Sequence, residues 1–314
     1  MGKSDIQSKD LLQWNEYFAD TVNYMLFDGN QVVIPEELKE LDTTELTIVD
    51  DVVKESVFIQ KYRDVLKRAI IRVDKKAIYA IVGIEGQTDI HYALPVKESL
   101  YDAIRYAKQV EKASASLKKE SEGEKISGAE FLSGFRKNDK ILPIITITVY
   151  FGTKEWDGPL SLHKMFDEAI DENVLSLIPD YKVHLLEPTK ITDWSRFKSD
   201  IGILYQLISV SNLKNGVKNV IESDKDRFRN VDNKVVRAVN FYTNTTLPVD
   251  EERGVTDMCY AMETFKEEAI AEGIKQGIEQ GIEQGRELQR EEDTRIIASL
   301  KERIEELESK INND

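Results

Sequence analysis

The stretch Ile78-Tyr79-Ala80-Ile81-Val82-Gly83-Ile84-Glu85-Gly86-Gln87 decides the predicted fold. A short apolar run rich in β-branched residues indicates a strand that is buried on both faces. Side chains alternate along a strand, so Glu85 and Gln87 point to the same face. A charge beside a core is costly unless it is paired or binds a metal. Asp64 stands 21 residues before Glu85. If Asp64 lies on the neighbouring strand, two carboxylates and an amide meet at one sheet edge, a ligand set that suits Mg²⁺.

Composition sets broad limits on the class of protein. A chain of 314 residues with 41% hydrophobic and 8% aromatic residues can form one large domain with appendages, or two domains. No apolar run approaches the roughly 18 residues of a membrane span, so no membrane association is expected. Cys259 is the only cysteine, which rules out an intrachain disulfide, and the N-terminus is polar. The three histidines are scattered without zinc-ligand spacing. A cytoplasmic location is therefore expected.

The net charge of −15 argues against a nucleic-acid partner at first sight, but the charge is unevenly distributed. Residues 250–314 carry 19 acids and 9 bases, whereas residues 105–140 carry 9 bases and 6 acids. Residues 213–240 carry 7 bases and 4 acids. Local basic patches are thus compatible with an acidic protein, and solvated helix faces explain the same residues equally well.

The order of predicted elements indicates an α/β arrangement with helices over a central sheet. Apolar spacing predicts a helix over 9–27 that stops at Gly29. The pattern of residues 63–73 fits a strand or a helix; because an apolar strand over 77–85 follows across a short turn, we expect two strands joined as a hairpin. A helix over 94–117 follows, then a solvated loop over 118–139 and a clear strand over 141–151. Further along we expect a helix over 162–170, a short strand over 181–186 and helices within 194–239.

Several short motifs, taken in order, resemble a known family. They are Tyr17-Phe18-Ala19-Asp20, Arg63-Asp64-Val65, Ile84-Glu85-Gly86-Gln87, Tyr101-Asp102-Ala103 with Tyr106 and Gln109, and Val149-Tyr150-Phe151-Gly152 followed by Trp156-Asp157-Gly158-Pro159. Over residues 10 to 240 the chain resembles the Rpn family of recombination-promoting nucleases, also labelled putative transposases. That family belongs to the PD-(D/E)XK nuclease superfamily. The resemblance implies a restriction-endonuclease-like mixed sheet flanked by helices, and a Mg²⁺-dependent DNA endonuclease associated with recombination or mobile elements.

The resemblance also implies roles for particular residues. Asp64 becomes the first metal ligand and Glu85 the second. Because Mg²⁺ keeps several waters and needs few protein ligands, the backbone carbonyl of Gly86 or of its neighbour would complete the site. Gln87 stands where the superfamily has lysine; its amide can orient water or a phosphate oxygen but supplies no positive charge. Asp20 and Gln109 are possible additions to the site. A nuclease whose site has decayed, acting as a DNA-binding or assembly protein, is the alternative.

Two further features bear on partners. Basic residues that could contact DNA phosphates are Lys118, Lys119, Arg136, Lys137, Arg227 and Arg229. The tail repeats glycine at 273, 277, 281 and 285, and then Ile297, Leu300, Ile304, Leu307 and Ile311 form a short heptad-like seam. We therefore expect a nuclease-like domain over 1–245, and a glycine-repeat helix with a short coiled coil over 246–314. That tail would mediate homo-oligomerisation, whereas a frayed soluble helix is the simpler alternative.

Overall fold

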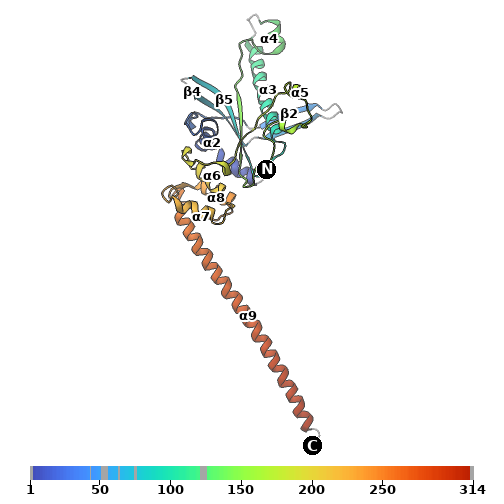
Figure 1. Cartoon of the computed structure of the whole chain (residues 1–314), viewed down its shortest axis with the longest axis vertical. Coiled ribbons are helices and arrows are strands. Elements are labelled where there is room, and N and C mark those ends of the chain that lie inside the picture. Colours follow the sequence, from blue (N-terminus) through green and yellow to red (C-terminus); the bar gives the residue numbers. More distant parts are fainter. Residues whose placement is uncertain are drawn as a thin grey trace. The chain divides into compact units, whose positions relative to one another are not determined.

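The computed structural model describes residues 3–42, 44–50, 56–62, 64–73, 76–120 and 126–311. It divides into two compact units, Met1–Met258 and Cys259–Asp314. The first unit is a mixed α/β body and the second consists of most of one long helix (Figure 1). Arg63, the first residue of one predicted strand, and residues 121–125 of the predicted loop lie outside the described residues.

The body is built on a five-stranded mixed sheet in the order β1-β4-β5-β6-β7. Its strands are β1 (Lys39–Glu40), β4 (Val65–Val73), β5 (Lys76–Gln87), β6 (Ile144–Tyr150) and β7 (His184–Leu186). β4 runs antiparallel to β5, whereas β5, β6 and β7 are parallel. The expected α/β class is confirmed at this level.

The predicted hairpin is present and its register is continuous. Val65 pairs with Ile84, and Val73 pairs with Lys76 at the turn. Ile81, Val82 and Ile84 of β5 are buried, as a strand covered on both faces requires, whereas Ile78 and Tyr79 near its start are each 53% exposed, so only the second half of the stretch is buried as predicted. The apolar stretch before Glu85 therefore lies at the centre of the sheet.

Helices cover both faces of the sheet. α3 (Leu94–Glu120) packs on β6, and it places Asp102 against Thr146. On the opposite face, α1 (Lys3–Leu12) packs on β5 and is followed by α2 (Asn15–Phe27). Because side chains alternate along β5, Glu85 faces α3 whereas Gly86 faces α1.

The single helix predicted over 9–27 is wrong, because the structure has two helices with a break at Gln13 and Trp14. Trp14 is extended (φ −71°, ψ 126°). Lys67, which is buried on β4, donates its Nζ to the carbonyl of Gln13 and to Asn15 Oδ1. Apolar spacing does not reveal this long-range bond. The predicted stop is correct: Asp28 and Gly29 both have positive φ.

Two other predictions also differ from the structure. The segment predicted as a helix over 162–170 holds only a 3-10 turn, η2 (His163–Met165). The loop predicted over 118–139 contains α4 (Gly128–Ser133), because Ser127 and Glu130 form a capping box. α3 also extends to Glu120, beyond its predicted end.

The body ends in a series of small elements. After α5 (Glu172–Leu175) come η3 (Pro188–Lys190), η4 (Trp194–Arg196), α6 (Ile201–Ser209), α7 (Gly216–Ser223), β8 (Val231–Asp232), α8 (Asn233–Thr243) and β9 (Val255–Thr256). Of these, α8 packs against α1 and α6 against α2. α6 is almost entirely buried and packs on α8, so it forms the centre of this helical part.

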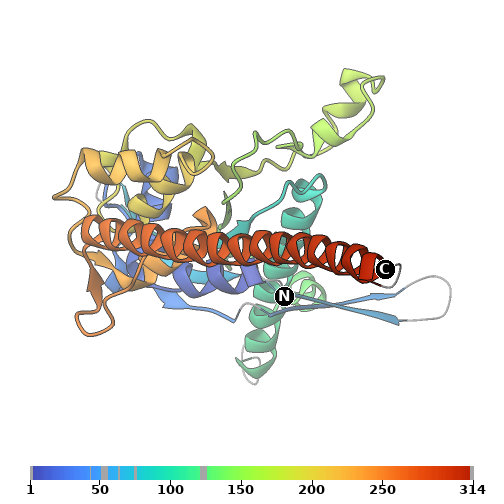
Figure 2. The same cartoon turned by 90° about the horizontal axis from the view of Figure 1, so that it is seen from below.

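The remaining elements do not belong to the main sheet. β2 (Thr44–Asp50) and β3 (Ser56–Tyr62) pair as a separate two-stranded ribbon that projects from the body (Figure 2). α9 (Met258–Ile311) is one continuous helix of 54 residues. A short 3-10 turn, η1 (Pro35–Glu37), precedes β1.

Candidate active site at the edge of the sheet

Asp64 and Glu85 meet where the neighbouring strands β4 and β5 reach the same end of the central sheet. Val65 pairs with Ile84, so the next residues outward on the two strands are Asp64 and Glu85. Asp64 Oδ2 accepts a hydrogen bond of 2.7 Å from the backbone N–H of Gly86. This hydrogen bond extends the contact between β4 and β5 by one residue beyond the last backbone pair, and it holds the Asp64 carboxylate beside Glu85.

Lys97 of α3 supplies the positive charge that Gln87 cannot. Its Nζ lies 2.7 Å from Glu85 Oε2, and its side chain is 22% exposed whereas that of Glu85 is 2% exposed. The ammonium also lies 5.8 Å from the ring centroid of Tyr101. Burial opposes the charged form, but the charges of Glu85 and Asp64 outweigh burial and raise the pKa of Lys97. Two carboxylates and one ammonium thus form one electrostatic group.

A second buried carboxyl adjoins this group. Glu98 is completely buried, and its Oε1 accepts a hydrogen bond from the Thr148 hydroxyl on β6. Thr148 is the register partner of Glu85. Burial, with the added repulsion of Glu85, raises the pKa of Glu98 to about 8, so this side chain is neutral at pH 7.

Within the part of the chain that the structure describes, Glu85 Oε1 and Glu98 Oε2 are buried oxygens without a hydrogen-bond partner. Such atoms are rare in folded proteins, because leaving a buried polar atom unsatisfied costs roughly 1–3 kcal/mol. A divalent cation bound by Glu85 would satisfy its orphan oxygen, so the residues present fit a hard cation. The described residues form no cluster of three or more His, Cys, Asp or Glu side chains in metal-binding geometry.

A glycine at position 86 is required by the packing of α1 on the sheet. A Cβ at this position would lie 2.5 Å from Ser8 Cβ on α1 and 3.1 Å from Phe151. The glycine therefore allows α1 to pack closely on the back of the sheet. Gln87, the last residue of β5, is half-buried, and its carbonyl accepts a hydrogen bond from the Phe151 N–H at the same sheet edge.

Asp20 and Gln109, the two residues predicted as possible additions to the site, bind other parts of the fold. Asp20 is buried, and its carboxylate accepts hydrogen bonds from the N–H groups of Lys198 and Ser199 and from the Ser199 hydroxyl, just before α6. Gln109 brackets the backbone of Leu142, donating to its carbonyl and accepting from its N–H. Both arrangements connect parts of the fold, and Gln109 lies about 18 Å along α3 from Lys97.

The predicted DNA-binding residues at the end of α3 and after α4 lie far from the carboxylates. Lys118 and Lys119 end α3, about 30 Å along the helix from Lys97. Arg136 and Lys137 follow α4 near the same end. The two arginines after α7 lie beside acids: Arg229 pairs with Asp226 at 3.3 Å, and the charges of Asp224 and of Asp200, just before α6, act on Arg227.

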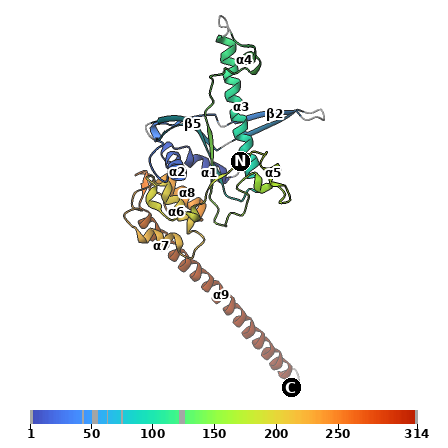
Figure 3. The ribbon, with the colours of Figure 1, turned by 45° about the horizontal axis from the view of Figure 1, so that its top comes forward.

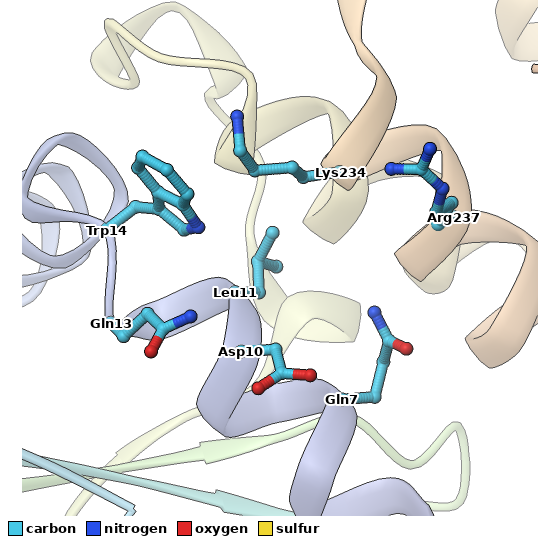
Figure 4. Close-up of a pocket in the computed structure, with 7 residues that line it drawn as sticks. All are labelled: Gln7, Asp10, Leu11, Gln13, Trp14, Lys234 and Arg237. Carbon is cyan, nitrogen blue, oxygen red and sulfur yellow. The ribbon is translucent and has the colours of Figure 1, made fainter. Parts of the chain in front are cut away.

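A cavity of about 430 Å³ lies elsewhere in the body, between α1 and α8 (Figure 4). Trp14, Lys234 and Arg237 line it together with Gln7, Asp10, Leu11 and Gln13. Lys234 pairs with Asp232 at 2.8 Å, and Arg237 pairs with Glu251 at 2.5 Å. Acids of the fold already neutralise both cations, and none of the predicted site residues lines this cavity.

Lys97 and Glu98 are the site residues that sequence reasoning missed. A signal was present, because the first turn of the helix after a carboxylate-bearing strand passes over that strand's end in an α/β unit. Sequence reasoning also missed Glu187. This residue follows β7 at the same end of the sheet, is 8% exposed and pairs with Lys190 at 2.7 Å. Its Oε2 also has no hydrogen-bond partner among the described residues.

Comparison with known proteins gives no match: no family model, no curated protein and no solved structure matches this chain. Among the helices that the structure describes, none combines the length and the apolar content needed to cross a bilayer.

Proposed function

We propose that this protein is a divalent-cation-dependent endonuclease that hydrolyses phosphodiester bonds in DNA. The observation that carries the proposal is the juxtaposition of Asp64, Glu85 and Lys97 at one edge of a mixed sheet. The resemblance of the sequence to the Rpn nucleases supports the choice of DNA. A restriction-endonuclease-like fold is part of the same proposal.

The residues have separate tasks in this scheme. Asp64 and Glu85 would hold the cation, with a carbonyl of the β5 end as a further ligand. When bound, Mg²⁺ supplies a more acidic water and neutralises charge on the phosphate. Lys97, a fixed positive charge, stabilises the negative charge that develops on the phosphate oxygens. Gln87 can orient a water or a phosphate oxygen through its amide.

Lys97 resolves the difficulty posed by Gln87. Hydrolysis of a phosphodiester benefits from a cation near the reacting oxygens, and a neutral amide does not provide one. A lysine from α3 reaches the same carboxylate from the helix instead of from the strand. What matters for this chemistry is therefore where the ammonium group lies in the fold, and a lysine on a helix can take the place of a lysine on the strand.

A catalytically decayed nuclease that binds DNA is the second candidate. The burial of Glu85 favours it, because a carboxylate that is 2% exposed and already paired with Lys97 is not open to substrate. In the active protein, Lys97 and Asp64 must form the path to the cation, since Lys97 is partly exposed and Asp64 is half-buried.

The test is conversion of supercoiled plasmid to nicked circles, with Mg²⁺ and with EDTA. We expect Mg²⁺-dependent nicking by the wild type and a loss of at least a hundredfold in Asp64→Asn and in Glu85→Gln. Glu111→Gln, an exposed change on α3, is the matched control. Wild-type nicking without metal, or equal nicking by all variants, would refute the assignment. A wild type that binds plasmid without cutting it supports the decayed alternative.

We also propose that α9 binds a second copy of the chain. Ile270, Ile274, Ile278 and Ile282 are each at least 50% exposed, and Leu300, Ile304 and Leu307 continue the apolar seam. A Cβ added at Gly273, Gly277, Gly281 or Gly285 would meet nothing within 4 Å. Glycines in a helix cost about 1 kcal/mol each relative to alanine, and close approach of a partner helix would offset that cost.

A further inference from the structure

The last part of α9 carries an apolar seam with the spacing of a coiled coil. Ile297, Leu300, Ile304 and Leu307 alternate steps of three and four residues along one unbroken helix (Figure 3). Their side chains are between 46% and 57% exposed. In heptad terms, the two isoleucines occupy position a and the two leucines occupy position d. These four residues are the heptad seam.

The residue types of the heptad seam favour a pair of helices. In parallel coiled coils, isoleucine at a with leucine at d favours two strands, whereas leucine at a with isoleucine at d favours higher oligomers. Both a residues of the heptad seam are isoleucine, and both d residues are leucine. A second copy of the chain presents the same pattern, so each a residue can pack on its own counterpart and each d residue likewise.

Charged residues beside the heptad seam select the direction of the pair. In a parallel pair, position g of one helix faces position e of the following heptad in the other helix. Arg303 at g then faces Glu308 at e of the second copy, and symmetry makes this ion pair twice. In an antiparallel pair g faces g, and positions 296, 303 and 310 hold no acid. The charges therefore favour the parallel direction.

These two charged side chains are accessible to a second copy. Arg303 and Glu308 are both exposed. Within one chain Arg303 pairs with Glu306, which lies at the outer position c. An exposed pair of this kind contributes little to stability, so it does not prevent Arg303 from pairing across the interface.

We propose that two copies of the chain pair the end of α9 in parallel and in register, with the heptad seam buried and Arg303–Glu308 ion pairs on both sides. The inference rests on the proposal that α9 binds a second copy, and it adds the direction of that pairing. The body ends at Met258, where α9 begins, so a parallel pair brings two bodies to the same end of the paired helices. One duplex can then meet two Asp64–Glu85 sites, one for each strand.

Disulfide formation in the full chain measures the direction of the pair. The natural cysteine is first removed by Cys259→Ser, and Leu300→Cys and Leu307→Cys are then made separately. A parallel, in-register pair places each d residue beside its own counterpart, so both variants should form covalent dimers on oxidation with copper phenanthroline. An antiparallel pair places at most one of these positions beside its own counterpart. Ser299→Cys, at the outer position c, is the matched control and should form none.

Charge reversal tests the ion pairs by sedimentation equilibrium. Arg303→Glu places two acids opposite each other and Glu308→Arg two cations, so each change should raise the dissociation constant of the dimer about tenfold at low salt and less at high salt. The combined swap restores opposite charges and should return the constant to near the wild-type value. Glu302→Arg, which changes the charge equally at the outer position f, is the matched control.

The outcomes separate the direction of pairing from pairing itself. Cross-linking at only one of the two leucine positions, or no recovery in the combined swap, would overturn the parallel direction. If light scattering still gives the wild type the mass of two chains, self-association through α9 stands. A monomeric wild type would overturn self-association and its direction together. These readouts need no catalysis, so they decide the pairing whether or not the protein cuts DNA.

Plasmid cleavage tests the consequence for the proposed nuclease. At a protein concentration between the two dissociation constants, the wild type should produce linear DNA, whereas Arg303→Glu should produce mainly nicked circles. An equal share of linear DNA from both proteins would overturn joint cutting of the two strands. No cutting by either protein would refute the nuclease proposal, and the cross-links would still decide the direction of pairing.

Discussion

The role of Lys97 depends on one ion pair with Glu85. Lys97→Met leaves the Glu85 carboxylate buried without its cation, and breaking a buried pair in this way costs up to about 3–5 kcal/mol. The partial exposure of Lys97 reduces that cost, so we expect a loss of stability of about 1–3 kcal/mol. Nicking should fall at least a hundredfold. Urea unfolding and the plasmid assay measure the two effects separately.

Lys112→Met is the control for this change, because Lys112 is an exposed lysine on the same helix. We expect it to leave both stability and nicking near the wild-type values. A Lys97→Met protein that nicks plasmid as fast as the wild type would contradict the role given to this ammonium group.

Glu98 makes stability depend on pH. Its pKa is about 8 in the folded state and 4.5 in the unfolded state, so between these values the folded state binds the extra proton. The stabilising effect of that proton is complete below about pH 4.5 and is lost as pH rises to about 8, by at most about 1.4 kcal/mol per pH unit. Glu98→Gln should therefore be more stable than the wild type at pH 8, and the difference should shrink toward pH 5. Thermal unfolding at pH 5, 6.5 and 8 checks this, and a difference that grows toward pH 5 would contradict it.

At the scale of elements, the contact between α1 and β5 depends on the absence of a side chain at Gly86. Gly86→Ala places a methyl group 2.5 Å from Ser8 Cβ, which forces α1 away from the sheet. Overpacking of this kind costs about 1–3 kcal/mol. Gly128→Ala is the control, because nothing lies within 4 Å of a Cβ there.

Adding Ser8→Gly tests whether this contact is the cause. Removing Ser8 Cβ opens the space that the added methyl group would need, so the double variant should lose less stability than the sum of the two single changes. Strict additivity of the two free energies of unfolding would mean that the clash lies elsewhere.

The sequence predicts those elements whose pattern is local. The strand β5, the glycine stop after α2 and the helix predicted over 94–117 each depend on neighbours in the chain, and all three are present. The break between α1 and α2 depends on Lys67, more than fifty residues away, and no local pattern encodes it. α4 is predictable from Ser127 and Glu130, because a capping box is a short-range signal.

The same distinction applies to the candidate site. Asp64 lies beside Glu85 once the register of the hairpin is fixed. The tight turn between the two strands fixes that register, and the 21-residue separation of Asp64 and Glu85 agrees with it. The partners of these carboxylates come from α3, whose position over the sheet is a tertiary property. Spacing along the chain therefore does not assign Lys97 and Glu98, and the one signal for them is their position in the first turns of the helix that follows β5.

At the scale of the whole molecule, α9 gives the chain a helix about 80 Å long with an exposed apolar seam. By light scattering, the full-length protein should have the molar mass of at least two chains, and a protein ending at residue 270 that of one chain. The body of the shortened protein should unfold at the same temperature. The physical reason is that an isolated amphipathic helix gains stability only by covering its apolar stripe. A full-length protein that is already monomeric would contradict this prediction.

The central claim is that Asp64 and Glu85 together bind one divalent cation beside Lys97. Titration of the wild-type protein with Mn²⁺, followed by electron paramagnetic resonance of the free ion, tests it directly. The account predicts one Mn²⁺ site that Mg²⁺ displaces and that is lost in both Asp64→Asn and Glu85→Gln. Undiminished Mn²⁺ binding by Glu85→Gln, or no binding by the wild type, would contradict it.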